Sequence, residues 1–151
     1  MSVEIEEYEP EMSGPFSALV GRIIRGLYRH LKGSSILVAT DAGYYVYECE
    51  GDCCSSSWFS DLLNVEVLTD QKVISVQVKE LPKEFVPPEV RDKYECLQVY
   101  GYSIRTQFGV ADIVFRNSSN GFYGGWVKNP IFHERFNVDG NWVEVKDDWS
   151  D

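Results

Sequence analysis

Apolar residues recur at steps of three and four near the start of the chain. They are Phe16, Leu19, Val20, Ile23, Leu27 and Leu31. This spacing puts them on one face of an amphipathic helix, which Gly33 can end. We therefore expect a helix over residues 16–32. Gly21 and Gly26 disfavour a helix interior, so a strand over residues 22–31 is the alternative.

Beyond residue 35 the pattern changes to the alternation of apolar and polar residues that is typical of strands. It predicts a hairpin, a single strand, a second hairpin and a final strand, over residues 36–49, 72–81, 95–116 and 142–145. A serine near residue 57 can cap a short helix that carries Trp58, Phe59, Leu62 and Leu63 inward. Three prolines between residues 82 and 88 predict a loop.

These elements predict one α+β domain, with a curved, mainly antiparallel sheet of about five to seven strands and one or two helices packed on one face. We place the domain at residues 13–145, with a flexible acidic tail at residues 1–12 and an acidic tail at residues 146–151. An edge of the sheet or the first helix offers a surface for a homo-oligomer.

Negative charge gathers at the two ends of the chain. Residues 1–11 contain five acids and no base, and residues 139–151 contain five acids and one base, within a net charge of −10. The remaining residues are close to neutral. This distribution argues against direct binding of nucleic acid, because phosphates would meet a field of the same sign.

Familiar chemical sites and targeting signals are missing from the sequence. The four cysteines lack the paired spacing of zinc modules, and neither His30 nor His133 lies in a catalytic motif, so we expect no metal, no cofactor and no enzyme activity. No apolar run approaches the roughly 20 residues of a membrane span, and the acidic start does not resemble a secretory leader. We expect reduced thiols and a cytoplasmic protein.

The segment 116–126 has the composition of a ligand-binding loop. It contains one arginine, two asparagines, two serines, three glycines and three aromatic residues. Glycines allow a close backbone approach, amides read polar edges, and aromatic rings stack on a base. The candidate ligand-binding residues here are Arg116, Asn117, Ser118, Ser119, Asn120, Tyr123 and Trp126. The alternative is a glycine-rich hairpin whose polar residues only satisfy its turns.

Two further groups extend this candidate site. Ser55 and Trp58 belong to a small, serine-rich segment at residues 51–58, which can form an anion site if it begins a helix. Arg22 and Arg25 belong to a basic stripe that can add positive potential for an anionic ligand. The alternative for the stripe is a solvated face that balances the acidic ends.

Two sequence segments resemble the hallmark segments of an uncharacterised domain family of phages and bacteria. They are GDCCSSSW at residues 51–58 and FRNSSNGFYGG at residues 115–125. The resemblance covers about residues 19–127, and it implies a strand over residues 22–31. Proteins of this family resemble the products of phage accessory genes, which are often small counter-defence proteins that act by binding. For a phage-encoded protein the site of action is the host cytoplasm.

We expect a non-enzymatic binding protein that sequesters a small nucleotide-derived immune signal. In this hypothesis Arg116 meets a phosphate, the asparagines read polar edges and the aromatic rings stack on a base. The alternative is an acidic protein-binding inhibitor, for instance a DNA mimic, that blocks a host defence nuclease or another host factor.

Overall fold

The chain forms strands over most of its length. A computed structural model describes residues 10–51, 55–80, 96–119 and 125–151. One helix and one 3-10 turn occur in this part of the chain, α2 (Pro10–Ser17) and η1 (Val65–Val67). The strands are β1 (Ile23–His30), β2 (Ser35–Thr40), β3 (Tyr44–Gly51), β4 (Ser56–Leu63), β5 (Gln71–Lys72), β6 (Ser75–Glu80), β7 (Cys96–Thr106), β8 (Gly109–Ser119), β9 (Gly125–Val127), β10 (Ile131–His133), β11 (Trp142–Glu144) and β12 (Trp149–Ser150).

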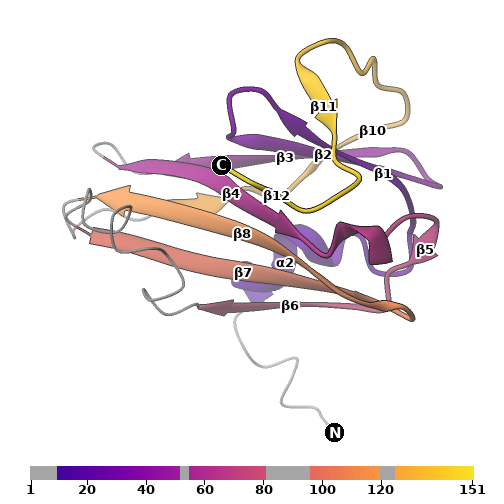
Figure 1. Cartoon of the computed structure of the whole chain (residues 1–151), viewed down its shortest axis with the longest axis horizontal. Helices are drawn as coiled ribbons and strands as arrows, with labels where there is room; N and C mark the ends of the chain where they lie inside the picture. Colours follow the sequence, from indigo (N-terminus) through magenta and orange to yellow (C-terminus); the bar gives the residue numbers. More distant parts are fainter. Residues whose placement is uncertain (1–9, 52–54, 81–95, 120–124) are drawn as a thin grey trace, which may run out of the picture.

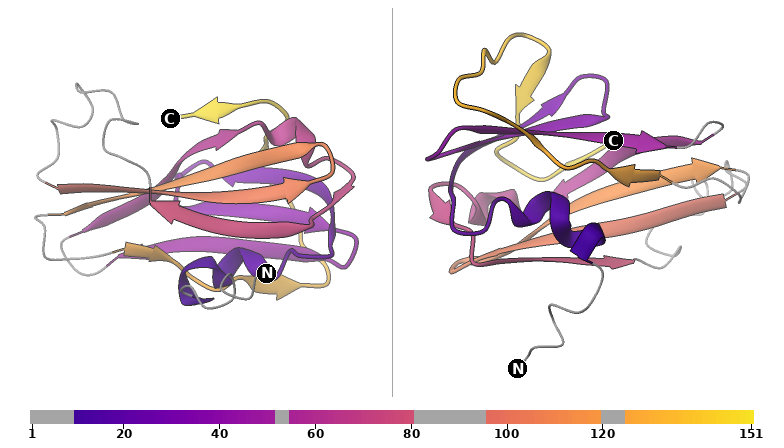
Figure 2. Two further views of the ribbon diagram at one scale, coloured as in Figure 1. Left: turned by 90° about the horizontal axis from the view of Figure 1, so that it is seen from below. Right: turned by 180° about the vertical axis from the view of Figure 1, so that it is seen from behind.

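The strands form two antiparallel sheets that face each other (Figures 1 and 2). The first sheet has the order β10-β3-β2-β1-β11, with β5 added to β1 and β9 added to β3. The second has the order β12-β4-β8-β7-β6. The expected antiparallel sheet and both hairpins are confirmed, but the strands divide between two layers. The expected helices on one face of a single sheet are not supported.

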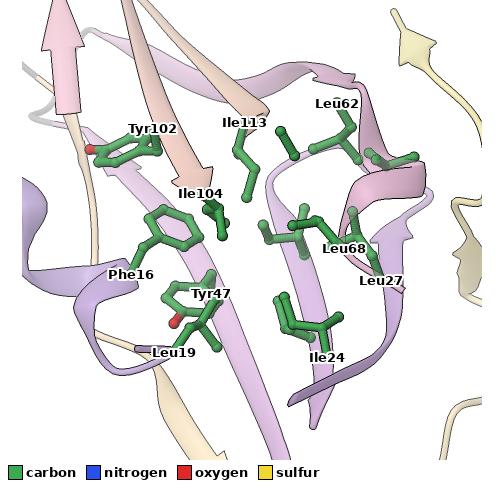
Figure 3. Close-up of a cluster of buried hydrophobic side chains, with 14 of the residues drawn as sticks. Phe16, Leu19, Ile24, Leu27, Tyr47, Leu62, Leu68, Tyr102, Ile104 and Ile113 are labelled. Carbon is green, nitrogen blue, oxygen red and sulfur yellow. The ribbon is translucent and has the colours of Figure 1, made fainter. Parts of the chain in front are cut away.

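The main core lies between the two sheets (Figure 3). Phe16, near the end of α2, inserts its ring between them and stacks on Tyr47 of β3 at a centroid distance of 4.2 Å. The same ring lies 4.8 Å from that of Tyr102 on β7. Phe16, Leu19 and Tyr47 are all fully buried. The short helix α2 thus delivers one aromatic anchor to the core and does not cover a sheet face.

The helix expected over residues 16–32 is wrong, and the alternative strand is correct. β1 pairs with β2, and the register shifts between Ile24 and Gly26. In a regular strand Ile24 and Leu27 would face opposite sides, because side chains alternate. The irregularity turns both into the core, where they are 1% and 5% exposed. A β-bulge therefore produced the three-residue spacing that is typical of a helix.

The short helix expected near residues 57–63 is wrong for the same reason. These residues belong to β4, whose pairing with β8 shifts between Phe59 and Asp61. Phe59 and Leu62 both join the core between the sheets, again three residues apart. Ser60 lies at the irregularity, so a second bulge explains the second helical spacing.

The last 20 or so residues wrap around both sheets. β10 pairs with the edge of β3, β11 with the edge of β1, and β12 with the edge of β4. The acidic end, which we expected to be a tail, is bonded into the fold: Asp148 accepts the backbone N–H of Asn64, and Asp151 accepts the indole N–H of Trp58. Trp149 lies under the guanidinium of Arg29 at 4.6 Å.

No helix in the described ranges is long and apolar enough to cross a membrane.

One polar atom in the main core has no hydrogen-bond partner, the hydroxyl of Tyr47. Burial raises the pKa of this phenol, because the charged form would lose its hydration. We expect Tyr47→Phe to stabilise the protein by about 1 kcal/mol, since an unbonded buried hydroxyl costs about that much. Denaturant unfolding measures the change. Tyr45→Phe, at a partly buried ring, is the control, and a destabilised Tyr47→Phe protein would contradict the expectation.

Candidate functional site

The two segments singled out in the sequence meet at one end of the molecule. Within the second sheet, Ser57 pairs with Asn117 and Trp58 with Arg116, so β4 and the end of β8 run side by side. Within the first sheet, Gly51 pairs with Gly125. This end of both sheets is opposite the end that carries β5 (Figure 1). Of the expected loop, residues 116–119 belong to β8 and residues 125–126 to β9, whereas residues 120–124 lie outside the described residues.

Arg116 and Asn117 do not line one pocket, although they are neighbours in the sequence. Phe115 belongs to the core between the sheets, and Asn117 follows it on the same face. Arg116 follows Val114, which belongs to a separate apolar cluster on the outer face of the second sheet. The expectation of a shared pocket is wrong, because consecutive residues of a strand point to opposite sides.

On the inner face, Asn117 anchors a small polar network. Asn117 is fully buried, its Oδ1 accepts the hydroxyl of Ser57 at 2.8 Å, and its Nδ2 donates to Oε1 of Gln98 at 3.2 Å. Gly125 of β9 lies directly against this pair, because a Cβ there would collide with Ser57 Oγ and with Asn117. We assign this network a structural role: it links β4, β8 and β7 of the second sheet where the apolar core ends, and Gly125 of the first sheet packs against it.

Replacing Gly125 by alanine should destabilise the protein by about 1–3 kcal/mol, because the added methyl group has to displace the Ser57–Asn117 hydrogen bond. Its Cβ would lie 2.7 Å from Cγ of Asn117. Thermal and denaturant unfolding measure the loss. Gly140→Ala is the matched control, since a Cβ at Gly140 meets nothing within 4 Å. Equal stability of the two variants would show that the sheets are not packed closely here.

On the outer face, Arg116 is buried beside Asp61. The Nη2 of Arg116 lies 3.4 Å from Oδ2 of Asp61, and each side chain is 8% exposed. Asp61 also accepts the hydroxyl of Ser60 at 2.8 Å. An apolar cluster of Leu97, Val99 and Val114, with Trp58 and Leu63 packed against it, lies on the same face. We name Arg116, Asp61, Ser60 and Trp58 the outer-face site.

The guanidinium of Arg116 uses little of its bonding capacity. Its Nε is buried and has no hydrogen-bond partner. Its contact with Asp61, at 3.4 Å, is longer than the roughly 2.7–2.9 Å that is usual for a charge-assisted hydrogen bond. A planar guanidinium can hold an oxyanion through two parallel N–H groups, one of which is Nε–H. The outer-face site therefore has a buried donor that lacks an acceptor.

The arginines of the expected basic stripe lie far from the outer-face site. The backbone of Gly21 and Arg22 is bonded to Val73, and the next residue, Ile74, is bonded to Arg105, beside the β7–β8 turn at the other end of β8. Six residues of strand, about 20 Å, separate that end from Arg116. Arg22 and Arg25 pair with Asp41 and Asp70 at 3.9 and 2.9 Å. The expectation that Arg22 and Arg25 add positive electrostatic potential to the site around Arg116 is therefore wrong.

The other candidate residues are spread over several surfaces. Ser118 shares the face of Arg116, Ser119 shares that of Asn117, and Ser55 directly precedes β4. Trp126 pairs with Glu50 in the first sheet and is 44% exposed, on the side away from Gly125 and the core. Asn120 and Tyr123 lie outside the described residues, as do Cys53 and Cys54 of the serine-rich segment.

Asp61 and Ser60 were missed in the sequence. Nothing in the residues around them indicates a bulge that places Asp61 beside Arg116, and a helix was expected there. The one signal in the sequence was the position of Asp61 itself, an acidic residue between Ser60 and two leucines in an otherwise apolar segment.

Two other titratable groups, Cys49 and Tyr102, lie in the core or pack against it. Burial raises the pKa of the Cys49 thiol and of the Tyr102 phenol, since charging either would cost hydration. The Cys49 thiol is thus a poor nucleophile in the native protein. In the ranges that the structure describes, no three His, Cys, Asp or Glu side chains come together as metal ligands.

The comparisons with known proteins identify the family. Residues 17–128 match a family described as Domain of unknown function (DUF7448). An uncharacterised protein of Acanthamoeba polyphaga mimivirus is 31% identical over 91 residues, which cover 56% of this chain and 67% of that protein. No solved structure matches the chain. β10, β11 and β12 lie beyond the matched residues, whereas Asp61 and Arg116 lie within them. The chain belongs to the DUF7448 family.

Proposed function

We propose that the chain is a non-enzymatic binding protein that sequesters a small nucleotide-derived ligand at the outer-face site. The observation that carries the proposal is the Nε of Arg116, a donor on a cation more than nine-tenths buried that has no acceptor. Unpaired buried donors are uncommon in proteins, and a bound acceptor is one way to satisfy them. The oxygen of a phosphate has the charge and shape that this donor requires.

The neighbours of Arg116 suit the rest of a nucleotide. The carboxylate of Asp61 accepts hydroxyl groups, as it does from Ser60 at 2.8 Å, so it can accept a ribose hydroxyl. Trp58 is opposite Arg116 in the register and offers an aromatic surface for a base. One cation, one carboxylate and one indole within two paired strands thus match phosphate, sugar and base.

An uncharacterised relative is encoded by a virus, and a role in a conflict between virus and host is part of this proposal. We infer that the ligand is a nucleotide signal of host immunity and that binding removes it from its receptor. For the competing hypothesis, an acidic inhibitor, two of the five C-terminal acids are less available to a partner, because Asp148 and Asp151 are already bonded to Asn64 and Trp58. This leaves the outer-face site as the better candidate.

The test is mass spectrometry of small molecules that heat releases from the purified protein, after incubation with lysate of cells whose nucleotide-signalling defences are active. Arg116→Lys keeps the charge and removes the planar fork, so we expect it to retain at least tenfold less of the released species than the wild type. Arg25→Ala, at an arginine whose side chain is 52% exposed, is the matched control and should behave like the wild type.

A nucleotide-like species in stoichiometric amount from the wild type and from Arg25→Ala supports the proposal. Equal amounts from Arg116→Lys would place the ligand elsewhere on the chain. Empty protein from several lysates, with both variants folded by circular dichroism, would contradict sequestration of a nucleotide.

A further inference from the structure

The outer edge of β1 has a gap between two strands. β5 pairs with Ile23 and Ile24 at one end of β1, and β11 pairs with Tyr28 and the residues after it at the other. In the part of the chain that the structure describes, no strand pairs with residues 25–27 on this edge. The gap coincides with the bulge of β1, and bulges are frequent where a strand stops pairing beside a binding site.

A cavity of about 180 Å³ lies at this gap. Its inner wall consists of Leu27, Val65 and Leu68, which are 5%, 3% and 2% exposed. Two backbone hydrogen bonds lie at its ends, from Asp70 N to Ile24 O and from Val145 N to Leu27 O. The chain therefore leaves a short apolar slot and does not close it with a further strand.

Polar groups are present at the mouth of this slot. Because the C=O of Leu27 bonds Val145 on this edge, the N–H of Leu27 points to the same edge. Lys146 is 76% exposed in its side chain, and its ammonium is 3.9 Å from Glu144, too far for a hydrogen bond. Arg25 also lines the slot, but it is bonded to Asp70 at 2.9 Å. The Leu27 N–H and the Lys146 ammonium are thus two donors for a ligand, beside the hydroxyl of Thr69 and the carboxylate of Glu144, which also line the slot.

We propose that this slot binds a small monocarboxylate with a compact apolar body. The carboxylate accepts from the Leu27 N–H and from Lys146, and the body fills the space against Leu27, Val65 and Leu68. A cavity of about 150 Å³ holds benzene, so the size suits a body of roughly six to nine non-hydrogen atoms. The slot is separate from the outer-face site and does not depend on the function proposed there.

The test is an NMR titration of the full chain with phenylacetate, in which the backbone amide of Leu27 is followed. We expect a saturable one-site shift of this amide. Benzyl alcohol, which has the ring without the carboxylate, should bind about fivefold more weakly, and acetate, which has only the carboxylate, should give no saturable shift.

Two variants at the mouth of the slot separate a real site from weak surface binding. Lys146→Gln should weaken phenylacetate about fivefold, whereas Lys128→Gln, at a lysine that pairs with Glu48 and Glu50, should leave the affinity unchanged. Thr69→Trp, at an exposed lining residue, should abolish the shift by filling the mouth. No saturable shift at Leu27, or equal affinities in Lys146→Gln and Lys128→Gln, would overturn the proposal.

Discussion

Replacing Asp61 by leucine is expected to lower the free energy of unfolding by about 3–5 kcal/mol, because it leaves the guanidinium of Arg116 buried without its counter-charge. Arg116→Met should cost a similar amount, since it leaves the carboxylate of Asp61 buried and charged. Both side chains are 8% exposed, so water can hydrate the remaining charge only in part. Urea unfolding, monitored by tryptophan fluorescence, measures both losses.

The double variant Asp61→Leu/Arg116→Met completes the cycle. Apolar residues of similar volume often replace a buried ion pair with little loss of stability, so we expect the double variant to recover most of what either single change loses. Additive losses would mean that the two side chains do not interact. Single losses below about 1 kcal/mol would mean that the pair is hydrated, as exposed pairs are.

Phe16→Ala should lower the free energy of unfolding by about 3–5 kcal/mol, because it removes a fully buried ring and leaves a cavity between the sheets. The ring contacts both layers, through Tyr47 of β3 and Tyr102 of β7. For a chain of this length the thermal midpoint should fall by roughly 6–20 °C.

Val20→Ala is the matched control for Phe16→Ala. It also truncates an apolar residue of the same segment, but Val20 is 45% exposed and should lose less than about 1 kcal/mol. A Phe16→Ala protein as stable as Val20→Ala would contradict the insertion of this segment between the sheets.

The hairpins and the antiparallel class could be predicted from the sequence, because regular alternation places side chains without ambiguity. The two expected helices failed at Ile24–Leu27 and Phe59–Leu62, where a bulge moves two residues three apart to the same face. A bulge leaves no mark in a single sequence other than this spacing, which a helix also produces. In both cases the pairing partner, not the local sequence, decides the structure.

The candidate site could be predicted only in part. The two unusual segments do meet, through the pairing of β4 with β8 and of β3 with β9. Composition alone cannot tell which residues of a segment point to which face of a sheet. Only the structure shows that Asn117 has a structural role on the inner face and that Arg116 is a binding candidate on the outer face. Asp61, 55 residues before Arg116, became visible only through the strand register.

The proposed function requires that Arg116 Nε–H is a buried donor available to a ligand. The most direct measurement is the ¹⁵N–¹H resonance of this group, assigned by its loss in Arg116→Lys and followed during titration with a nucleoside 5′-monophosphate. We expect the resonance to shift and to saturate at one equivalent, because Nε–H gains a phosphate acceptor, while the Nε–H resonance of Arg25 stays in place. An unchanged Arg116 resonance, at concentrations where the nucleotide shifts other parts of the spectrum, would contradict it.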